Sequence, residues 1–267
     1  MGARVHTNFE RALTVSSLSV ILISKNEAAN IRECLQSVAW ADEIIVVDSG
    51  STDQTCRIAK EMGAQVHVHA DWPGFGPQKN RVLGYAGKDW VFSIDADERV
   101  TPELRAEIEH AMRTGKADGY YCPRLSQFCG QFVHHSGWYP DYVLRLFKRG
   151  AGKFSESLVH ESVLLNGRTE KMKTPLLHYS YLTADDVERK VEHYSTAAAQ
   201  QMFQAGKRSS RAGAALRGGW AFVRTYLLRL GVLDGSAGLN IARMNARTTY
   251  LKYRKLEALN STGHSPK

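Results

Sequence analysis

Three short apolar runs, each followed by a carboxylate, constrain the fold of this chain more than any other sequence feature. They cover Leu18–Ser24, Glu43–Val47 and Trp90–Ile94, and they are rich in the β-branched and aromatic residues typical of buried strands. Gln65–Ala70 predicts one further strand. Strand and helix alternate over short links, which predicts an α/β fold with a mostly parallel sheet flanked by helices. One helix is expected over 28–40, and a second runs from a cap at Ser51 or Thr52 to Met62. A third is expected over 78–86, after a loop at 72–77, with Val82 and Tyr85 facing inward.

Acidic residues follow all three runs. Glu27 comes after the first, Asp48 after the second, and Asp95 and Asp97 after the third. Open α/β sheets keep their ligands at the carboxyl ends of their strands, so we expect these acids to gather at one edge. Paired carboxylates there can hold a hard divalent cation against a phosphate. The alternative is an ordinary loop in which Asp95 caps the following helix.

The phosphate-binding motifs of two large enzyme classes are missing. No G-x-G-x-x-G follows the first run, and no G-x-x-x-x-G-K-[ST] occurs in the chain, which disfavours dinucleotide enzymes and P-loop enzymes. A metal at Asp97 could instead hold a nucleoside diphosphate that departs as a leaving group. This is the chemistry of sugar transfer.

The second half of the chain has a different pattern. Its loop at 129–140 is rich in aromatic and histidine residues, so we expect it to touch a flat group such as a sugar ring, or another loop. A helix over 184–205 should be capped by Thr183, and its acidic first turn suits the helix dipole. The other elements expected here are a helix over 102–113 and strands over 119–128, 141–149 and 157–164.

Charge is distributed unevenly along the 267 residues. The net charge is +8, yet residues 206–267 hold twelve Lys or Arg and two acids, so the rest of the chain is slightly negative. Such asymmetry indicates an anionic partner, either a membrane or a nucleic acid. Nucleic acid is disfavoured because no recognised binding module accompanies the charge. The hydrophobic content of 43% suits a globular protein of one large domain, alone or with an appendage.

The segment 219–232 combines an apolar stripe with two arginines. The stripe consists of Trp220, Val223, Leu227 and Leu230, and the segment is too short and too charged to span a bilayer. We expect an amphipathic helix that lies on an anionic membrane, with residues 206–260 as the contact surface. The alternative is a helix pair that packs on the main domain. Four cysteines without a C-x-x-C pair, and opening residues without a long apolar run, predict a cytoplasmic protein, peripheral on the inner face of the cytoplasmic membrane.

Four motifs, in this order, resemble those of glycosyltransferase family 2, whose inverting GT-A enzymes use nucleotide sugars. They are Ser24-Lys25-Asn26-Glu27, Val46 to Asp53, Gln78-Lys79-Asn80 and Asp95-Ala96-Asp97. Further segments resemble the bacterial lipopolysaccharide core β-1,4-glucosyltransferases over nearly the whole chain. These are residues 74–80, 144–147, 159–161 and the basic C-terminal segment.

The resemblance implies a GT-A fold, UDP-glucose as donor and an inner-core heptose as acceptor. Glu27 and Asp48 should bind the uridine, and Lys79 should face the base or phosphate. Asp97 should ligate Mg²⁺ or Mn²⁺, which neutralises charge on the departing UDP. His160 would complete the metal shell and favour Mn²⁺, unless it is a packed core histidine. The expected nucleotide-sugar site comprises Ser24, Asn26, Glu27, Asp48, Lys79, Asp95 and Asp97.

Inversion by direct displacement needs a general base for the acceptor hydroxyl. Many family members place it in a Glu-Asp pair after the acid triplet, and this chain has no such pair. We predict Glu161 as the base, with Asp141 second. The alternative for Glu161 is an ion pair with a neighbouring arginine, and Arg145 pairs either with a phosphate or with a carboxylate of the sheet.

The predicted organisation has three parts. Residues 1–17 form a flexible arm, 18–205 the catalytic domain and 206–267 a basic helical segment. Within the catalytic domain, 18–100 is the nucleotide half and 101–205 the acceptor half.

Three other functions stay open. One is a family 2 transferase that acts on polyprenyl phosphate or another cell-surface glycan, and another is a catalytically silent carbohydrate- or membrane-binding protein. The third is a nucleotidyltransferase, disfavoured because residues 24–30 lack the glycine of a triphosphate loop.

Overall fold

The computed structural model describes residues 16–156, 161–181 and 183–261, and the chain forms two compact units. The first unit contains the residues up to Ala96 together with Val100–Tyr121 and Leu144–Thr174. The second contains Asp97–Arg99, Cys122–Val143 and the residues from Pro175 onward. The chain therefore passes from the first unit to the second within the triplet Asp95-Ala96-Asp97.

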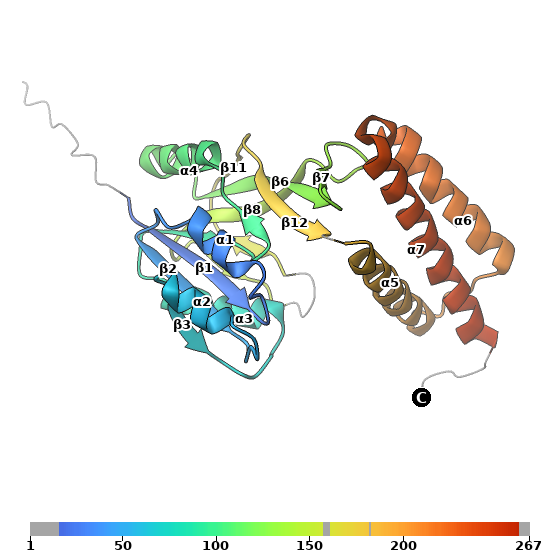
Figure 1. Cartoon of the computed structure of the whole chain (residues 1–267), viewed down its shortest axis with the longest axis horizontal. Helices are drawn as coiled ribbons and strands as arrows, with labels where there is room; N and C mark the ends of the chain where they lie inside the picture. Colours follow the sequence, from blue (N-terminus) through green and yellow to red (C-terminus); the bar gives the residue numbers. More distant parts are fainter. Residues whose placement is uncertain (1–15, 157–160, 182, 262–267) are drawn as a thin grey trace, which may run out of the picture. The chain divides into compact units, whose positions relative to one another are not determined.

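A buried parallel sheet forms the centre of the first unit (Figure 1). β1 (Leu18–Ser24) lies between β2 (Glu43–Asp48) and β4 (Trp90–Ser93), and both neighbours run parallel to it. β3 (Gln65–Val68) pairs with β2, and β8 (Asp141–Lys148) pairs antiparallel with β4. Nearly every side chain of β1, β2 and β4 is buried, which confirms the three strands predicted from the apolar runs.

Four helices accompany this sheet: α1 (Ile31–Ser37), α2 (Thr55–Glu61), α3 (Phe75–Tyr85) and α4 (Pro102–Thr114). α3 begins three residues earlier than predicted, because Pro77 lies in its first turn, where a helix needs no N–H from that residue. Its inward face holds Val82, whereas Tyr85 is 41% exposed and stacks on His67, so the inward prediction for Tyr85 was wrong. The remaining strands of this unit are β9 (Gly152–Phe154), β10 (Val163–Leu165) and β11 (Thr169–Lys171).

The cap predicted for α2 was also wrong. A capping hydroxyl accepts hydrogen bonds from helix N–H groups, whereas the Ser51 hydroxyl donates to Asp48, and α2 starts only at Thr55 with Gln54 at its cap position. Asp53 takes over the first turn, because its carboxylate accepts from the backbone N–H of Thr55 at 2.9 Å. The loop between β2 and α2 is therefore shaped by contacts to Asp48 rather than by helix capping.

The second unit joins a small sheet to three helices. β6 (Gly119–Phe128) extends into it from the first unit, and there it pairs with β12 (Leu176–Tyr181) and β7 (Gln131–Phe132). β12 also pairs antiparallel with β5 (Glu98–Arg99). The helices are α5 (Ala184–Gln204), α6 (Arg211–Val223) and α7 (Gly235–Ser261), and α7 packs against both others. The predicted cap of α5 is confirmed as a reciprocal capping box between Thr183 and Asp186.

The connection between α6 and α7 departs from the single helix predicted over 219–232. A π-helical turn over Arg224–Leu228 follows α6, and a 3₁₀ turn over Gly231–Asp234 leads into α7. The prediction was wrong because the chain must reverse tightly here. Leu230 adopts a left-handed φ of 54°, and a Cβ atom on Gly231 would lie 2.8 Å from the carbonyl oxygen of Thr225.

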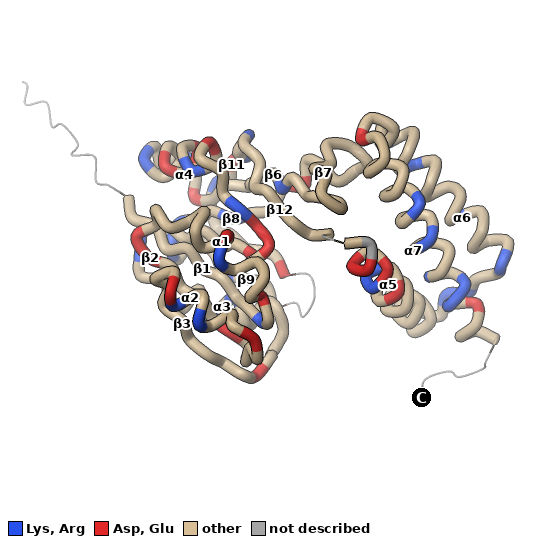
Figure 2. Tube along the Cα trace, viewed as in Figure 1, with Lys and Arg blue, Asp and Glu red and all other residues tan. Residues whose placement is uncertain are grey.

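Buried Asp234 fastens this connection to the loop at 134–136. Its carboxylate accepts hydrogen bonds from the backbone N–H groups of His134 and His135 and from the hydroxyl of Ser136. Figure 2 shows Lys and Arg positions along both α6 and α7. None of the helices in the described ranges combines the length and the apolar character that crossing a bilayer requires.

Candidate active site

Two strand ends in the first unit share one hydrogen-bond network. Ser24 and Asp48 are register partners at the ends of β1 and β2, and the Ser24 hydroxyl donates to Asp48 Oδ2 at 2.8 Å. Ser51 donates to Asp48 through its N–H at 2.7 Å, and its hydroxyl oxygen accepts from the N–H of Asn26 at 2.8 Å. Burial would raise the pKa of Asp48, but the hydrogen bonds from Ser51 and Ser24 hold it below its ordinary value. Asp48 is therefore a fixed, ionised acceptor at the sheet edge.

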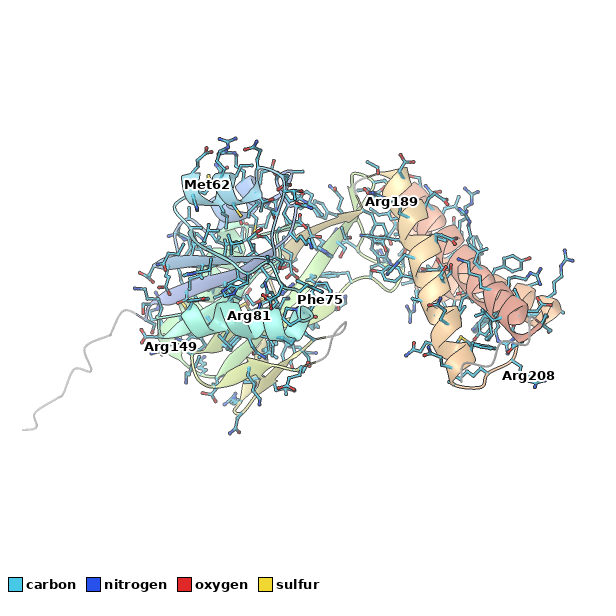
Figure 3. All side chains as sticks on the ribbon, turned by 90° about the horizontal axis from the view of Figure 1, so that it is seen from below. Met62, Phe75, Arg81, Arg149, Arg189 and Arg208 are labelled. Atoms are coloured by element: carbon cyan, nitrogen blue, oxygen red, sulfur yellow. The ribbon has the colours of Figure 1, made fainter. Side chains whose placement is uncertain are left out.

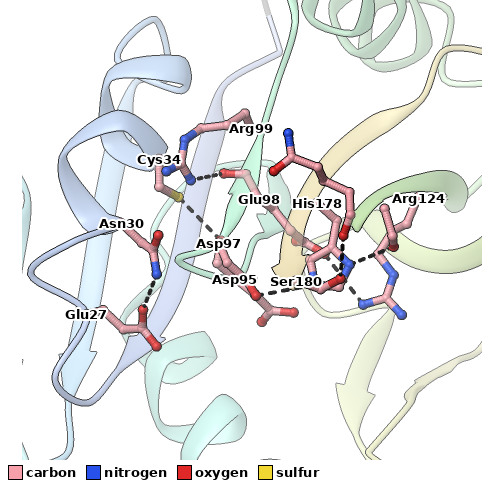
Figure 4. Close-up of polar contacts among 12 residues, drawn as sticks. Glu27, Asn30, Cys34, Asp95, Asp97, Glu98, Arg99, Arg124, His178 and Ser180 are labelled. Carbon is pink, nitrogen blue, oxygen red and sulfur yellow. Dashed lines mark hydrogen bonds and ion pairs between the residues drawn. The ribbon is translucent and has the colours of Figure 1, made fainter. Parts of the chain in front are cut away.

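A cavity of about 330 Å³ opens beside this network. Glu27 lines it, and Asn30 donates to the Glu27 carboxylate at 2.9 Å (Figure 4). Trp72 and Phe75 line it with rings that meet edge to face at 4.9 Å. Phe75 lies at the start of α3, where Figure 3 labels it. The cavity thus combines a carboxylate with two partly exposed aromatic rings, a combination suited to a ribose and a flat base.

Asp95 sits between two buried cations of the same unit. The amine of Lys79 lies 3.0 Å from Asp95 Oδ1, and the guanidinium of Arg145 lies 2.5 Å from Oδ2. Burial alone would raise the pKa of Asp95, yet the charges of Arg145 and Lys79 hold it well below the usual carboxyl range. Asp95 is therefore ionised at any physiological pH. Of the two partners expected for Arg145, the structure shows the carboxylate.

Lys79 belongs to the Gln78-Lys79-Asn80 motif, in which each side chain has its own contact. Gln78 donates to the Ser49 hydroxyl at 2.9 Å, and Asn80 exchanges two hydrogen bonds with the backbone of Phe154. The Lys79 amine lies 2.8 Å from Glu161 as well as near Asp95. The structure therefore places Glu161 in an ion pair, with a lysine where an arginine was the expected alternative.

Asp97, two residues after Asp95, faces a histidine in the second unit. Its Oδ2 lies 3.3 Å from Nε2 of His178 on β12 (Figure 4). Its backbone carbonyl accepts from the N–H of Tyr179 at 2.8 Å. The other ring nitrogen of His178 lies 2.9 Å from the hydroxyl of Ser126. A metal-binding histidine is usually oriented in this way, through a partner on its second nitrogen.

The donor set of this pair fits a divalent cation with open positions. Carboxylate oxygen and imidazole nitrogen suit Mn²⁺. Among the described residues, no group of three or more His, Cys, Asp or Glu side chains is arranged to hold a metal. A cation bound here would take two ligands from Asp97 and His178.

The other predicted residues are placed as follows. Asp141, on β8, lies in the second unit and pairs with Arg124 at 2.5 Å, and it lines the same cavity as Asp97 and His178. Glu161 lies in the first unit with Lys79. His160, predicted as a metal ligand, falls outside the described residues.

Sequence reasoning missed His178 altogether. The residue lies in an ordinary strand sequence, Leu177-His178-Tyr179, and no motif marks it. Its approach to Asp97 depends on the pairing of β12 with β5, in which His178 is the register partner of Glu98. The available signal was a polar residue at a half-buried strand position, which by itself does not identify a ligand.

Comparison with known proteins finds glycosyltransferases. Residues 19–160 match a family described as Glycosyl transferase family 2. An uncharacterized glycosyltransferase of Rickettsia bellii is 29% identical over 92% of this chain and 88% of its own length. The lipopolysaccharide core biosynthesis glycosyltransferase LpsC of Rhizobium meliloti is 33% identical over 72% of this chain and 73% of its own length.

Among solved structures, TarS of S. aureus in complex with UDP-GlcNAc resembles this chain in fold. The TM-score is 0.51 at 16% identity, and the match covers 94% of this chain and 93% of the TarS chain. This likeness confirms the predicted fold class, a mostly parallel sheet flanked by helices with helices at the C-terminal end.

Proposed function

Because this chain belongs to glycosyl transferase family 2, we propose that it transfers a sugar to a lipid-anchored saccharide. The proposed donor is UDP-glucose, from which glucose is transferred. One observation carries the proposal beyond family membership. The ends of β1 and β2 and the loop after β4 bring Ser24, Asp48 and Asp95 to one edge of the first unit's sheet, beside a cavity that Glu27, Trp72 and Phe75 line. Ligands of open α/β sheets bind at such an edge.

In the proposed donor site, the cavity beside Glu27 receives the uridine. The exposed faces of Trp72 and Phe75 offer a stacking surface for the base, and Glu27 accepts hydrogen bonds from the ribose hydroxyls. Ser24, Asn26 and Asp48 fix the shape of the adjoining loop. Lys79 and Arg145 keep Asp95 ionised near the donor sugar.

A divalent cation, Mg²⁺ or Mn²⁺, supplies charge neutralisation for the departing UDP when it is bound. We assign its protein ligands to Asp97 and His178, while His160 stays a prediction. Ser126 holds the imidazole of His178 in one orientation. The imidazole favours Mn²⁺ over Mg²⁺, because nitrogen ligands suit transition metals better.

Two carboxylates are candidates for the general base. Both are ion-paired: Arg124 donates to Asp141 Oδ2, and Lys79 pairs with Glu161 Oε1. Asp141 lines the cavity of the second unit together with Asp97, and its side chain is 47% exposed, whereas that of Glu161 is 17% exposed. A base must be accessible to take the acceptor's proton, so we favour Asp141 over our first choice from sequence. Replacing each by its amide separates them. Asp141→Asn should lower kcat by about 100-fold or more with UDP binding retained, and the same result for Glu161→Gln alone would restore the first choice.

The acceptor is proposed to be the inner-core heptose of lipopolysaccharide. Support comes from the relative LpsC, which is named for lipopolysaccharide core biosynthesis, and from the resemblance of the motifs. Polyprenyl phosphate and other cell-surface glycans are the alternative acceptors. The test offers labelled UDP-glucose, with Mn²⁺, to the purified protein together with truncated core lipid or polyprenyl phosphate. Transfer to the core lipid is expected, and transfer only to polyprenyl phosphate would overturn the acceptor.

A membrane surface is the proposed partner of the second unit's helices. Large apolar side chains are exposed along α6 and the turn after it, including Trp220 at 57%, Leu228 at 64% and Leu233 at 63%. The segment 206–233 contains six Lys or Arg and no acid. An apolar segment whose charged residues are all basic suits the interface of an anionic bilayer. The protein would then act as a peripheral protein on the cytoplasmic leaflet, where a lipid-anchored acceptor lies.

The predicted domain organisation, with a separate role for each part, remains part of this proposal. Residues 18–205 would form the catalytic domain, with donor binding in 18–100 and acceptor binding in 101–205, and residues 206–267 would provide the membrane contact. Residues 1–15 of the predicted N-terminal arm lie outside the described part of the chain. Ser17 donates from its N–H and its hydroxyl to Asp89.

A further inference from the structure

The second unit contains a cavity of about 560 Å³. It is formed mainly by β12, the first half of α5, the loop before β8 and part of α7. Its lining includes Asp97, Trp138, Asp141, His178, Tyr181 and Lys190. One part of the lining therefore carries the proposed metal ligands and the candidate base, while another carries aromatic rings and a lysine.

The aromatic lining is fixed in place by packing. The rings of Trp138 and Tyr181 lie 5.3 Å apart at an angle of 34°, and each also packs on Phe128, with centroids 5.8 Å and 5.7 Å away. Phe128 is only 4% exposed. Rigid aromatic faces in a polar cavity suit the apolar C–H face of a sugar ring, because such a face stacks while the hydroxyls find polar partners.

Lys190 also lines this cavity, close to the Tyr181 ring. Its amine donates to the carbonyl of Ser180 at 2.5 Å and lies 3.9 Å from the centre of the Tyr181 ring. None of the described Asp and Glu side chains forms an ion pair with it, whereas Arg189 next to it pairs with Asp186. Burial lowers the pKa of Lys190, although the charges of Asp97 and Asp186 partly oppose this.

A half-buried cation has lost hydration that one carbonyl oxygen and one ring face restore only in part. An anionic group of a ligand would supply the missing charge and would be bound more strongly than at the surface, because the site is partly desolvated. The cavity thus has a stacking surface for a sugar and a cation for an acidic substituent.

We propose that this cavity binds an acidic acceptor saccharide, with a phosphate or carboxylate of the acceptor on Lys190 and a sugar ring against Trp138 and Tyr181. The proposal rests on the transferase function above and specifies the chemical class of its acceptor. The acidic substituent would position the acceptor so that its reacting hydroxyl points toward Asp97 and Asp141 of the same cavity.

The test measures direct binding of three matched probes to the full-length protein with UDP and Mn²⁺ present: methyl glucoside, glucuronic acid and glucose 6-phosphate. Ligand-observed NMR titration gives the dissociation constants. We expect the acidic sugars to bind about 10-fold tighter than the neutral one, as one charge-assisted contact allows. A preference for one acid alone distinguishes carboxylate from phosphate as the recognised group. Equal affinity for all three probes would overturn the proposal.

Variants assign the effect to the lysine. Lys190→Gln should remove the preference for acidic sugars, and Lys190→Arg should keep most of it. Arg189→Gln is the matched control, since its side chain is 77% exposed and lies next to Lys190 on α5. Retention of the preference in Lys190→Gln, or its loss in Arg189→Gln, would contradict the assignment. Calorimetry of UDP binding with Mn²⁺ distinguishes a failure of the acceptor proposal from a failure of the transferase function. A protein that binds no UDP contradicts the transferase function itself.

Discussion

At the scale of single residues, the metal site proposed at Asp97 and His178 predicts how the protein responds to metal. Removing either proposed ligand would leave the cation with one protein contact. Asp97→Asn and His178→Gln should each weaken Mn²⁺ binding and turnover by about 100-fold, and Ser126→Ala by about 10-fold, as expected for a residue that only orients a ligand. Electron paramagnetic resonance of free Mn²⁺ in titrations measures the affinity.

The control for this prediction is His193→Gln, on the exposed part of α5. This variant should bind Mn²⁺ as the wild type does. Unchanged Mn²⁺ affinity in both Asp97→Asn and His178→Gln would remove these residues from the metal site.

Asp95 predicts a specific dependence of stability on pH. Its folded-state pKa lies below the value near 3.9 of an unfolded aspartate. The folded state thus binds the proton less readily, and the stabilising contribution is complete at neutral pH and is lost as the pH falls from about 5 through the folded pKa. In Asp95→Asn, the free energy of unfolding should be lower at pH 7 and should fall less steeply toward acid. Urea unfolding between about pH 7 and pH 2.5 measures both effects.

Asp71→Asn is the appropriate comparison. Asp71 also pairs with an arginine, Arg81, but its side chain is 62% exposed. Exposed ion pairs contribute little, so its stability curve should follow the wild type within about 0.5 kcal/mol. If the free energy of unfolding of Asp95→Asn varied with pH in parallel with that of the wild type, the pKa of Asp95 would not be lowered by Lys79 and Arg145.

At the scale of elements, substitutions at two adjacent glycines in α6 distinguish the effect of helix packing on stability from the effect of helix propensity. A Cβ atom on Gly218 would lie 3.2 Å from the carbonyl oxygen of Ala246 on α7, whereas one on Gly219 would meet nothing within 4 Å. Gly219→Ala should stabilise the protein by up to about 1 kcal/mol, because alanine favours helix. Gly218→Ala should instead lower stability by about 1 kcal/mol or more, because α6 and α7 must move apart.

Thermal unfolding of the two variants is the measurement. Equal shifts for both would mean that α6 does not approach α7 closely at Gly218.

The same helices show what sequence periodicity misses, since the stripe from Trp220 to Leu230 is exposed as expected but is not one helix. The reversal at Leu230 and Gly231 depends on contacts with Thr225 and with α7, and no window of sequence contains all of them.

At the scale of the whole molecule, membrane binding should depend on both apolar and basic residues of the second unit. Flotation with vesicles that contain anionic lipid should recover the wild type, and salt should weaken the binding, since each Lys or Arg near the surface contributes about 1 kcal/mol. Replacing Leu227, Leu228 and Leu233 by serine should abolish recovery.

Val68→Ser with Leu164→Ser provides the control. Both residues are large, apolar and exposed, at 59% and 52%, but they lie in the first unit. This control should float as the wild type does. Recovery of the triple serine variant at wild-type level, or binding to neutral vesicles alone, would contradict an anionic membrane as partner.

The sequence by itself determined the strands β1, β2 and β4, the acids that follow them and the basic C-terminal segment. These are local features, because short apolar runs define buried strands and parallel strands end at one edge. Only the tertiary structure brought His178 to Asp97, matched Lys79 and Arg145 with Asp95, and placed Lys190 beside Tyr181 in a cavity of the second unit. These contacts join residues far apart in the chain, and their geometry depends on strand register and helix packing that no local pattern encodes.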